Sequence, residues 1–367
     1  MVNRNTLDID CSAIHNPEAT FDLMNHIRAS YYLIGATLGR FGKAKVALPG
    51  GCNFGGVRPI DQHVKGFTAM GAEVAIKNGL VSAEAAGGRL KGANIYLDVV
   101  SVGATINLML AAALAEGTTV IENAAREPHI VDLANFLNSM GAKIQGAGTN
   151  VIKIRGVEEL SGGFYSIIPD QIEAGTYMAA VAGAGGEVLI KNVIPKHMNC
   201  ITGKLEEMGV TVVCGEDSVL VKREKPLLHT NFKTLPYPGF PTDMQPQLST
   251  ILTMAEGTSI VTEGVWDNRY KYVDELAKMG ASIHVDGHTA VISGSCRLTG
   301  ASIRACDLRA GAALVIAGLC ASGTTELSGV NYIERGYEDI VGKLRSVGAD
   351  ILSVTEPDDY EEIQEAI

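Results

Sequence analysis

A motif of eight residues occurs five times along the chain at a nearly constant interval. Each copy reads as the end of an apolar helix, a Met-Gly-Ala sequence or a close variant, and then a β-type segment, as in Phe67–Val74 (FTAMGAEV). The glycines of the motif are Gly71, Gly141, Gly209, Gly280 and Gly348, with spacings of 70, 68, 71 and 68 residues. Common solenoid repeats are about 20 to 50 residues long. The longer interval here predicts a series of small α/β subdomains.

The pattern within one interval predicts a strand, a helix, a second strand, a second helix and a hairpin. Glycine is favoured after a helix because the residue there often takes a positive φ. A second helix–glycine–strand signature occurs at Leu114–Ala124, Met254–Gly264 and Cys320–Val330. Sequences such as Lys77-Asn78-Gly79 are typical of hairpin turns. We therefore expect repeated βαβαββ units, with Ala/Gly-rich helices that pack closely.

The first repeat is expected to be incomplete. Counting back 70 residues from Gly71 places another helix-end glycine at about residue 1, and Asn5–Asp10 (NTLDID) resembles the hairpin strand that follows such a glycine. The chain is thus expected to begin inside a repeat, with roughly one repeat absent before it.

Composition excludes several classes of protein. Apolar residues make up 46% of the 367 residues, which is too many for a mainly disordered chain. The 30 basic and 41 acidic side chains give a net charge of −11, which disfavours a nucleic-acid binder. No apolar stretch reaches the roughly 18 residues of a membrane span. The seven cysteines show no CxxC spacing, so we expect free thiols and a cytoplasmic protein.

The glycine- and proline-rich segment Leu48–His63 (LPGGCNFGGVRPIDQH) predicts an irregular exposed loop. Binding and catalytic residues are often carried by such loops. A thiol beside a guanidinium can have a lowered pKa, so Cys52 near Arg58 is a candidate acid or nucleophile. In an alternative interpretation, Cys52 is a small buried apolar residue. A third interpretation is a cysteine hydrolase that uses Cys52 and His63.

A second segment, Tyr237–Gln247 (YPGFPTDMQPQ), places Asp243 where the small-residue helix of a repeat begins. In an alternative interpretation, Asp243 has a purely structural role as a helix cap. The equivalent points of other repeats are Arg28–Ser30, Ser101–Thr105, Asp170–Glu173 and Asp307–Ala310. Helix N-termini favour phosphate and carboxylate ligands, so we expect one cleft between two pseudo-symmetric halves.

Five arginines are predicted at the ends of elements rather than on helix faces, namely Arg28, Arg58, Arg269, Arg309 and Arg335. One such arginine is usually a surface ion-pair partner of little energetic weight. Five in an acidic protein indicate a basic pocket for a ligand with several negative charges, because guanidinium groups bind carboxylates and phosphates in a bidentate manner.

The motifs that carry a family resemblance are RAS, PGGC, RPIDQH, SVGAT, AEGTTVIENAAREP, FPTDMQ, NR, DLRA and RGYE, which are spread over the whole chain. Together they resemble the UDP-N-acetylglucosamine 1-carboxyvinyltransferase family of enolpyruvyl transferases, without its N-terminal segment. The resemblance implies an inside-out α/β barrel, the EPSP synthase-like fold. Two pseudo-symmetric enolpyruvyl transferase domains are expected, one at 1–168 with the cysteine loop and one at 169–367 with the general base.

The resemblance also implies the reaction, in which the enolpyruvyl group of phosphoenolpyruvate moves to the 3′-hydroxyl of UDP-N-acetylglucosamine and phosphate leaves. This is the first committed step of peptidoglycan synthesis. Cys52 would protonate the phosphoenolpyruvate methylene, and Asp243 would take the proton of the sugar hydroxyl. Carbon protonation and guanidinium groups suffice for this chemistry without a metal or an organic cofactor.

Further roles follow from the same resemblance. Arg58 and Arg335 would hold the phosphate of phosphoenolpyruvate, while Arg28, Arg269 and Arg309 would support its carboxylate or the surrounding charge network. Asp307 would support the arginines. Contacts with the sugar nucleotide would come from Arg58, Pro59, Ile60, Asp61, Gln62, Ser101, Val102, Gly103 and Val265. The two small-molecule substrates are the expected partners, with no nucleic acid, membrane insertion or obligate protein partner.

A second function class stays open, namely a catalytically inactive truncated paralogue that binds the sugar nucleotide or acts as a regulator. Two features motivate it. The family has a Lys-Asn pair near its N-terminus, and this chain is expected to start after that pair. The loop sequence CNFGGVRP also has one residue more than the family pattern between Cys52 and Arg58.

Overall fold

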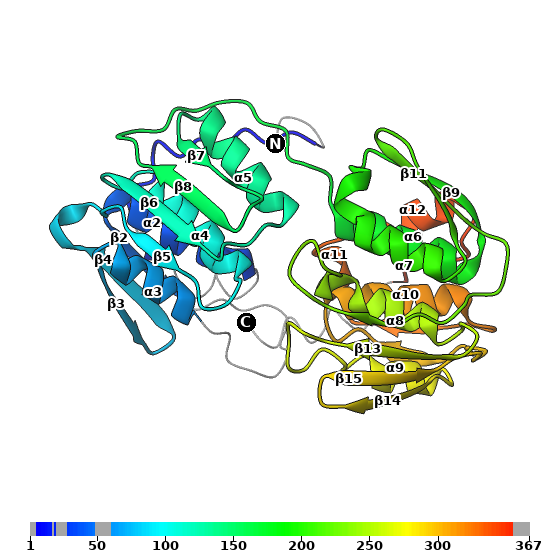
Figure 1. Cartoon of the computed structure of the whole chain (residues 1–367). Coiled ribbons are helices and arrows are strands. Elements are labelled where there is room, and N and C mark those ends of the chain that lie inside the picture. The colour runs from blue at the N-terminus through cyan, green and yellow to red at the C-terminus, as the bar shows by residue number, and fades with distance from the viewer. Residues whose placement is uncertain (1–4, 17, 20–27, 48–59, 355–367) are drawn as a thin grey trace. The chain divides into compact units, whose positions relative to one another are not determined.

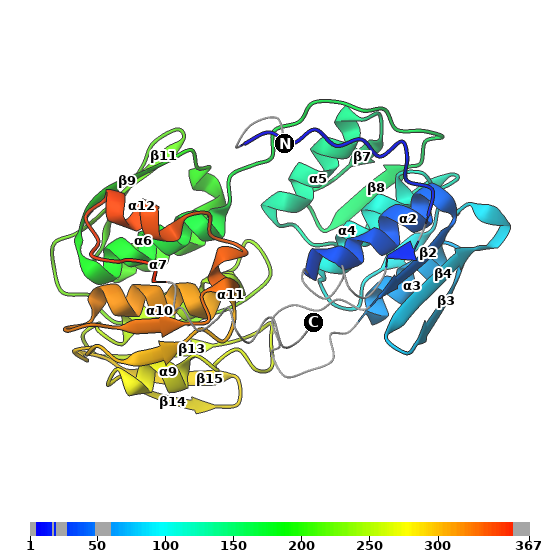
Figure 2. The ribbon, with the colours of Figure 1, turned by 180° about the vertical axis from the view of Figure 1, so that it is seen from behind.

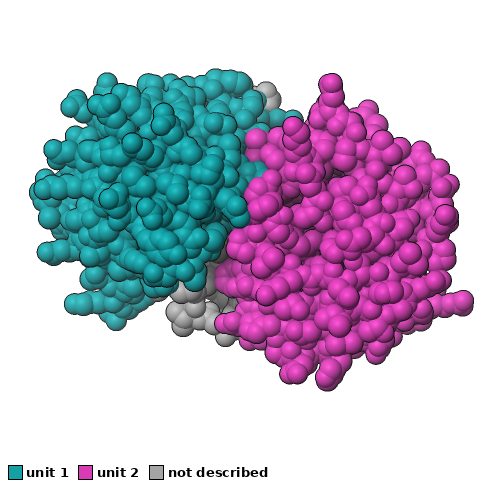
Figure 3. All heavy atoms as spheres, viewed as in Figure 1, with its two compact units in different colours: residues 1–51, 57–167 teal, residues 52–56, 168–367 magenta. Residues whose placement is uncertain are grey.

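A computed structural model of the protein describes residues 5–16, 18–19, 28–47 and 60–354. The described residues form two compact units, coloured separately in Figure 3. Unit 1 includes the described residues up to Ile167, and unit 2 runs from Ile168 to residue 354. The assignment of an enolpyruvyl transferase domain to 1–168 and a second to 169–367 stays a prediction.

Unit 1 contains two complete βαβαββ repeats (Figure 1). The first consists of β1 (Glu18–Ala19), the short 3-10 helix η1 (Arg28–Tyr32), α2 (Leu33–Phe41), β2 (Lys43–Ala47), α3 (Asp61–Ala69), β3 (Ala72–Lys77) and β4 (Leu80–Ala85). After η2 (Ala86–Gly88), the second consists of β5 (Asn94–Tyr96), α4 (Val102–Ala112), β6 (Thr118–Glu122), α5 (Pro128–Ser139), β7 (Lys143–Gln145) and β8 (Val151–Arg155).

Unit 2 contains three further copies of the repeat. The first consists of α6 (Gln171–Ala184), β9 (Gly186–Lys191), η3 (Pro195–Met198), α7 (Asn199–Glu207), β10 (Thr211–Cys214) and β11 (Ser218–Arg223). The second consists of β12 (Phe232–Lys233), η4 (Thr242–Met244), α8 (Gln245–Leu252), β13 (Thr258–Thr262), α9 (Val273–Lys278), β14 (Ser282–Asp286) and β15 (Thr289–Ser293). The third consists of β16 (Ser302–Arg304), α10 (Leu308–Cys320), β17 (Glu326–Ser328), α11 (Asn331–Glu334) and α12 (Ile340–Ser346).

The strand order repeats with the elements. The three four-stranded sheets have the orders β1-β2-β4-β3, β5-β6-β8-β7 and β12-β13-β15-β14. In each, the first two strands are parallel and the hairpin is antiparallel. The sheet β10-β11-β9 has three strands and β16-β17 has two among the described residues. The mixed sheets and the repeated βαβαββ order agree with the expected EPSP synthase-like fold.

The glycine signals are confirmed. Gly71, Gly141, Gly209, Gly280 and Gly348 all have φ between 84° and 103°. The hairpin predicted at Lys77-Asn78-Gly79 is the β3–β4 turn, in which Asn78 and Gly79 have φ of 51° and 73°. The strand expected at Asn5–Asp10 is wrong, because only Thr6 makes an isolated bridge there. Leu7 and Ile9 are 65% and 73% exposed, so no core packing stabilises an extended strand.

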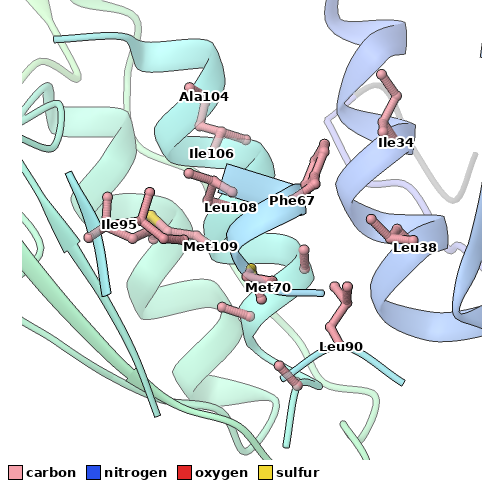
Figure 4. Packing of buried hydrophobic residues seen from close by; sticks show 14 of the residues in the cluster. Ile34, Leu38, Phe67, Met70, Leu90, Ile95, Ala104, Ile106, Leu108 and Met109 are labelled. Carbon is pink, nitrogen blue, oxygen red and sulfur yellow. The ribbon is translucent and has the colours of Figure 1, made fainter. Parts of the chain in front are cut away.

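Helices rich in small residues make the core of each unit. In unit 1, α4 packs against α2, and apolar side chains such as Leu38, Leu108 and Met109 are fully buried there (Figures 2 and 4). Gly35 of α2 lies so close to α4 that an added Cβ would overlap the Asn107 carbonyl, and its N–H donates to Asn107 Oδ1 at 2.8 Å. The expectation of close helix packing is therefore confirmed.

Unit 2 has the same design, because α10 packs against both α6 and α8 (Figure 1). None of the helices in the described part of the chain is long and apolar enough to span a membrane.

Candidate active site

Two of the three packed helices of unit 2, α6 and α10, begin at a capping aspartate. The carboxyl of Asp170 accepts from the N–H groups of Ile172 and Glu173 at the start of α6, at 2.7 and 3.2 Å. The carboxyl of Asp307 accepts from the N–H groups of Arg309 and Ala310 at the start of α10, both at 2.9 Å. Side-chain capping of this kind satisfies the free N–H groups of a helix start. Asp307 therefore fixes the backbone from which the Arg309 side chain extends.

Asp243 lies in η4, immediately before α8, and it is not a capping residue. Its Oδ1 accepts from Nη2 of Arg269 at 3.0 Å, and its Oδ2 accepts from Nε of Arg309 at 3.3 Å. The Arg269 side chain is 2% exposed and that of Arg309 is 13% exposed, whereas the Asp243 side chain is 41% exposed. The structure therefore places a partly exposed carboxylate between two largely buried guanidinium groups.

Nearby positive charge and burial shift the pKa of Asp243 in opposite directions. Burial raises the pKa of this carboxyl, but the positive charges of Arg309 and Arg269 and their hydrogen bonds outweigh it and hold the pKa well below its ordinary value of 3.8. The same pairing raises the pKa of Arg309 against the opposing effect of burial. Asp243 is thus ionised at neutral pH.

An aromatic ring supports the second guanidinium. The guanidinium carbon of Arg309 lies 5.4 Å from the centre of the Tyr337 ring, within cation–π range. The Tyr337 hydroxyl is 2.9 Å from Oγ1 of Thr176 on α6. Nη1 of Arg309 is buried and makes no hydrogen bond within the described residues. Arg309 is thus held between the Asp243 carboxylate and the Tyr337 ring.

Two other predicted residues of unit 2 are described, and one of them, Arg335, lies at the end of an element as expected. Arg335 follows α11 and is exposed, and its guanidinium carbon lies 5.4 Å from the centre of the Tyr332 ring. Val265 is 44% exposed in the loop after β13. The structure therefore joins Asp243, Arg269 and Arg309 by direct contacts, and their predicted roles toward a substrate stay predictions.

Unit 1 carries a second group of predicted residues at helix starts. Ser101 caps α4 by accepting from the Ala104 N–H at 3.2 Å, and Val102 and Gly103 are the first two residues of that helix. Asp61 begins α3, the Ile60 side chain is buried, and the Gln62 side chain bonds the segment before α4. Gln62 accepts from the Asp98 N–H at 2.9 Å and donates to Asp98 Oδ2 at 3.2 Å.

Gln62 therefore connects the two segments that were predicted to bind the sugar nucleotide.

Four predicted residues lie outside the described part of the chain or have an undescribed side chain. Arg28 is the first residue of η1, and nothing is described of its side chain. Cys52, Arg58 and Pro59 lie outside the described residues.

Sequence reasoning missed two buried residues next to the Asp243 cluster, Glu263 and Tyr337, which are both 1% exposed. Glu263 follows a strand and Tyr337 lies within the motif RGYE, where attention fell on the arginine. The motif held no local signal for this role, because the Tyr337 ring lies against Arg309 on another helix, whereas the nearby Arg335 lies against Tyr332. Glu263 has no local signal either.

Comparison with known proteins places this chain in a family. The family model of EPSP synthase (3-phosphoshikimate 1-carboxyvinyltransferase) matches residues 5–344. A UDP-N-acetylglucosamine 1-carboxyvinyltransferase from Clostridium botulinum is 61% identical over 346 residues, which cover 94% of this chain and 82% of the relative. A protein of the same name, numbered 2, from Clostridium acetobutylicum is 60% identical over 95% of this chain and 82% of its own length.

Solved structures agree with these relatives. The enolpyruvyl transferase NikO from Streptomyces tendae has a TM-score of 0.83 and 29% identity, over 95% of this chain and 82% of that one. An EPSP synthase from Acinetobacter baumannii has a TM-score of 0.66 at 21% identity over 88% of this chain and 77% of that one, and it supports the fold alone. The fold and the sequence thus define an enolpyruvyl transferase. Within that class, the chain belongs to the EPSP synthase family.

Proposed function

We propose that this enzyme transfers the 1-carboxyvinyl group of phosphoenolpyruvate to the 3′-hydroxyl of UDP-N-acetylglucosamine and releases phosphate. The observation that carries the proposal is the 61% identity over 94% of the chain to a relative that bears the name of this activity. The same proposal includes a role in peptidoglycan synthesis and a cytoplasmic location. Free thiols at all six described cysteines are consistent with that location.

The cluster around Asp243 suits this chemistry. Phosphoenolpyruvate carries a phosphate and a carboxylate, and guanidinium groups are the side chains that bind both most specifically. Arg309 has a buried donor, Nη1, that no described residue uses. An anionic substrate would satisfy this donor, because a buried donor without a partner costs about 1–3 kcal/mol.

The proposed reaction needs one acid and one base. Cys52 would donate a proton to C3 of phosphoenolpyruvate while the sugar 3′-oxygen forms a bond to C2, and Asp243 would accept the hydroxyl proton. A proton of C3 would then pass to the Cys52 thiolate as the bond from C2 to the phosphate oxygen breaks, and Asp243 would give its proton to the departing phosphate. These steps restore the vinyl group, the thiol and the carboxylate. The low pKa of Asp243 keeps it ionised before the reaction, so it starts in the form that a general base needs.

The test is phosphate release from phosphoenolpyruvate with three acceptors in separate assays: UDP-N-acetylglucosamine, shikimate 3-phosphate and water. We expect phosphate release with UDP-N-acetylglucosamine and not with the other two acceptors. Cys52→Ala and Asp243→Asn are each expected to lower the rate by roughly 100-fold or more, as for loss of a general acid or base. Cys214→Ala, which removes an exposed thiol from β10, serves as the matched control and should keep the wild-type rate.

Other outcomes have definite meanings. Release with shikimate 3-phosphate instead would keep the enzyme class and replace the acceptor. A folded protein that binds the sugar nucleotide in calorimetry but releases no phosphate would instead be an inactive binding protein. Equal rates for Cys52→Ala and the wild type would remove Cys52 from the mechanism.

A further inference from the structure

Glu263 is a buried carboxylate that no step of the proposed reaction uses. It directly follows β13 (Thr258–Thr262) and is 1% exposed. Four donors surround its two oxygens, two of them hydroxyls and two of them backbone N–H groups. The carboxylate therefore accepts hydrogen bonds at both of its oxygens, which satisfies its polar atoms inside the protein.

One oxygen of Glu263 holds the loop that leads to Arg269. Oε1 accepts from the N–H groups of Val265 and Trp266 at 2.9 and 3.2 Å. It also accepts from Oγ1 of Thr234 at 2.7 Å, and the same hydroxyl accepts from the Gly264 N–H at 2.7 Å. Thr234 itself is fully buried directly after β12. The first residues of the loop are therefore anchored to the core of the sheet.

The other oxygen of Glu263 holds the turn that carries Asp243. Oε2 accepts from Oγ1 of Thr242 at 3.0 Å. Thr242 is the first residue of η4 and Asp243 is the second. The hydroxyl of Thr242 thus connects this turn to Glu263.

We propose that Glu263 is a positioning residue for the Asp243–Arg269 pair, with its two oxygens holding the turn of Asp243 and the loop of Arg269 at a fixed separation. The pair spans only 3.0 Å, with Asp243 in the one-turn 3-10 helix η4 and Arg269 in a loop. Loops move more than longer helices and strands, so a common anchor for the turn and the loop helps to keep the two partners in contact. As a claim about catalysis, this inference rests on the proposed function.

The experiment uses the full chain and changes one hydroxyl at a time. Thr242→Val removes the donor to Oε2 while it keeps a side chain of similar shape, and Thr242→Ser keeps the hydroxyl. Thr119→Val is the matched control, because Thr119 is 1% exposed on β6 of unit 1 and its hydroxyl has no hydrogen-bond partner within the described residues. The kcat and KM values for both substrates are measured together with the thermal midpoint.

We expect Thr242→Val to lower kcat roughly 10- to 100-fold, since a displacement of about 1 Å at a reacting group can have an effect of that size. The KM values should stay near those of the wild type, because a base that is displaced weakens the chemical step rather than binding. Thr242→Ser should restore kcat, and Thr119→Val should leave it unchanged. Equal kcat values for Thr242→Val and Thr242→Ser would overturn the proposal.

A readout without substrates separates this inference from the proposed function. Backbone hydrogen exchange is followed in peptides that contain 238–246 and 264–270, with a peptide of α4 as internal reference. We expect Thr242→Val, but not Thr242→Ser, to increase exchange in the first peptide. If the wild type releases no phosphate, the proposed function fails and this comparison still decides the positioning role. Unchanged exchange in Thr242→Val would contradict it.

Discussion

Asp243 is a carboxylate whose charge is stabilised by two guanidinium groups against the cost of burial. Its folded pKa lies below its ordinary value of 3.8, so the folded state binds fewer protons than the unfolded state near that pH. The stabilisation from pairing is therefore fully present above about pH 5 and is lost as the pH falls toward the folded pKa. The pair also keeps the charges of Arg269 and Arg309 satisfied inside the unit.

The downward shift of the Asp243 pKa gives a prediction for Asp243→Asn. At pH 7 we expect the free energy of unfolding of the variant to be about 1–2 kcal/mol lower than that of the wild type. This is less than the loss for a fully buried ion pair, because the Asp243 side chain is 41% exposed. The difference should shrink as the pH falls from 5 to 3. Urea unfolding at pH 7, 5, 4 and 3 measures it. A difference that is constant with pH would show that the ordinary pKa of Asp243 is retained.

Some residues of the site could be predicted from the sequence, and others could not. Asp243, Asp307 and Arg309 lie at the starts of small-residue helices, and the repeat reveals such starts in the sequence. The capping role that is typical of aspartate in that position is confirmed for Asp307. Glu263 meets Thr234 at a separation of 29 residues. No local pattern encodes that contact, since it depends on which strands become neighbours.

At the scale of the element, α4 shows how one glycine permits a helix start. A Cβ added to Gly103 would overlap the hydroxyl of Tyr31. Tyr31 is 5% exposed and its ring lies 5.0 Å from that of Tyr32 and 5.2 Å from that of His63, so it cannot move aside easily. The glycine that was predicted to contact the sugar nucleotide therefore also has a packing role.

Gly103→Ala should consequently reverse the usual effect of this substitution in a helix. Alanine normally stabilises a helix by about 0.5–1 kcal/mol relative to glycine, but here we expect a loss of about 1–3 kcal/mol from overpacking. Tyr31→Phe, which removes the hydroxyl, should recover most of that loss in the double variant. Gly203→Ala in α7 is the control, because nothing lies within 4 Å of its added Cβ, and it should be stabilising. Denaturant unfolding of the four variants tests all of these signs.

At the scale of the whole molecule, the repeat period could be predicted because a helix in each repeat ends at a glycine of positive φ. The element order of each repeat followed from the same signals. The failed strand at Asn5–Asp10 shows the limit of this reasoning, since an alternating pattern forms a strand only where a partner strand and a core are available. The hydrophobic clusters show a further property, which is that each unit has a core of its own.

Separate cores predict that damage in one unit stays in that unit. Leu108 of α4 and Leu248 of α8 are both fully buried, one in each unit, and replacing either with alanine should cost about 2–5 kcal/mol. We expect Leu108→Ala to increase hydrogen exchange in the peptides of β5, β6 and β8, while the peptides of α6 and α10 keep their wild-type rates. We expect Leu248→Ala to increase exchange in the peptides of α6 and α10, while those of β5, β6 and β8 keep their wild-type rates. Each variant is then the control for the other, because both remove the same atoms. If both variants increase exchange equally in all these peptides, the two units unfold as one cooperative structure.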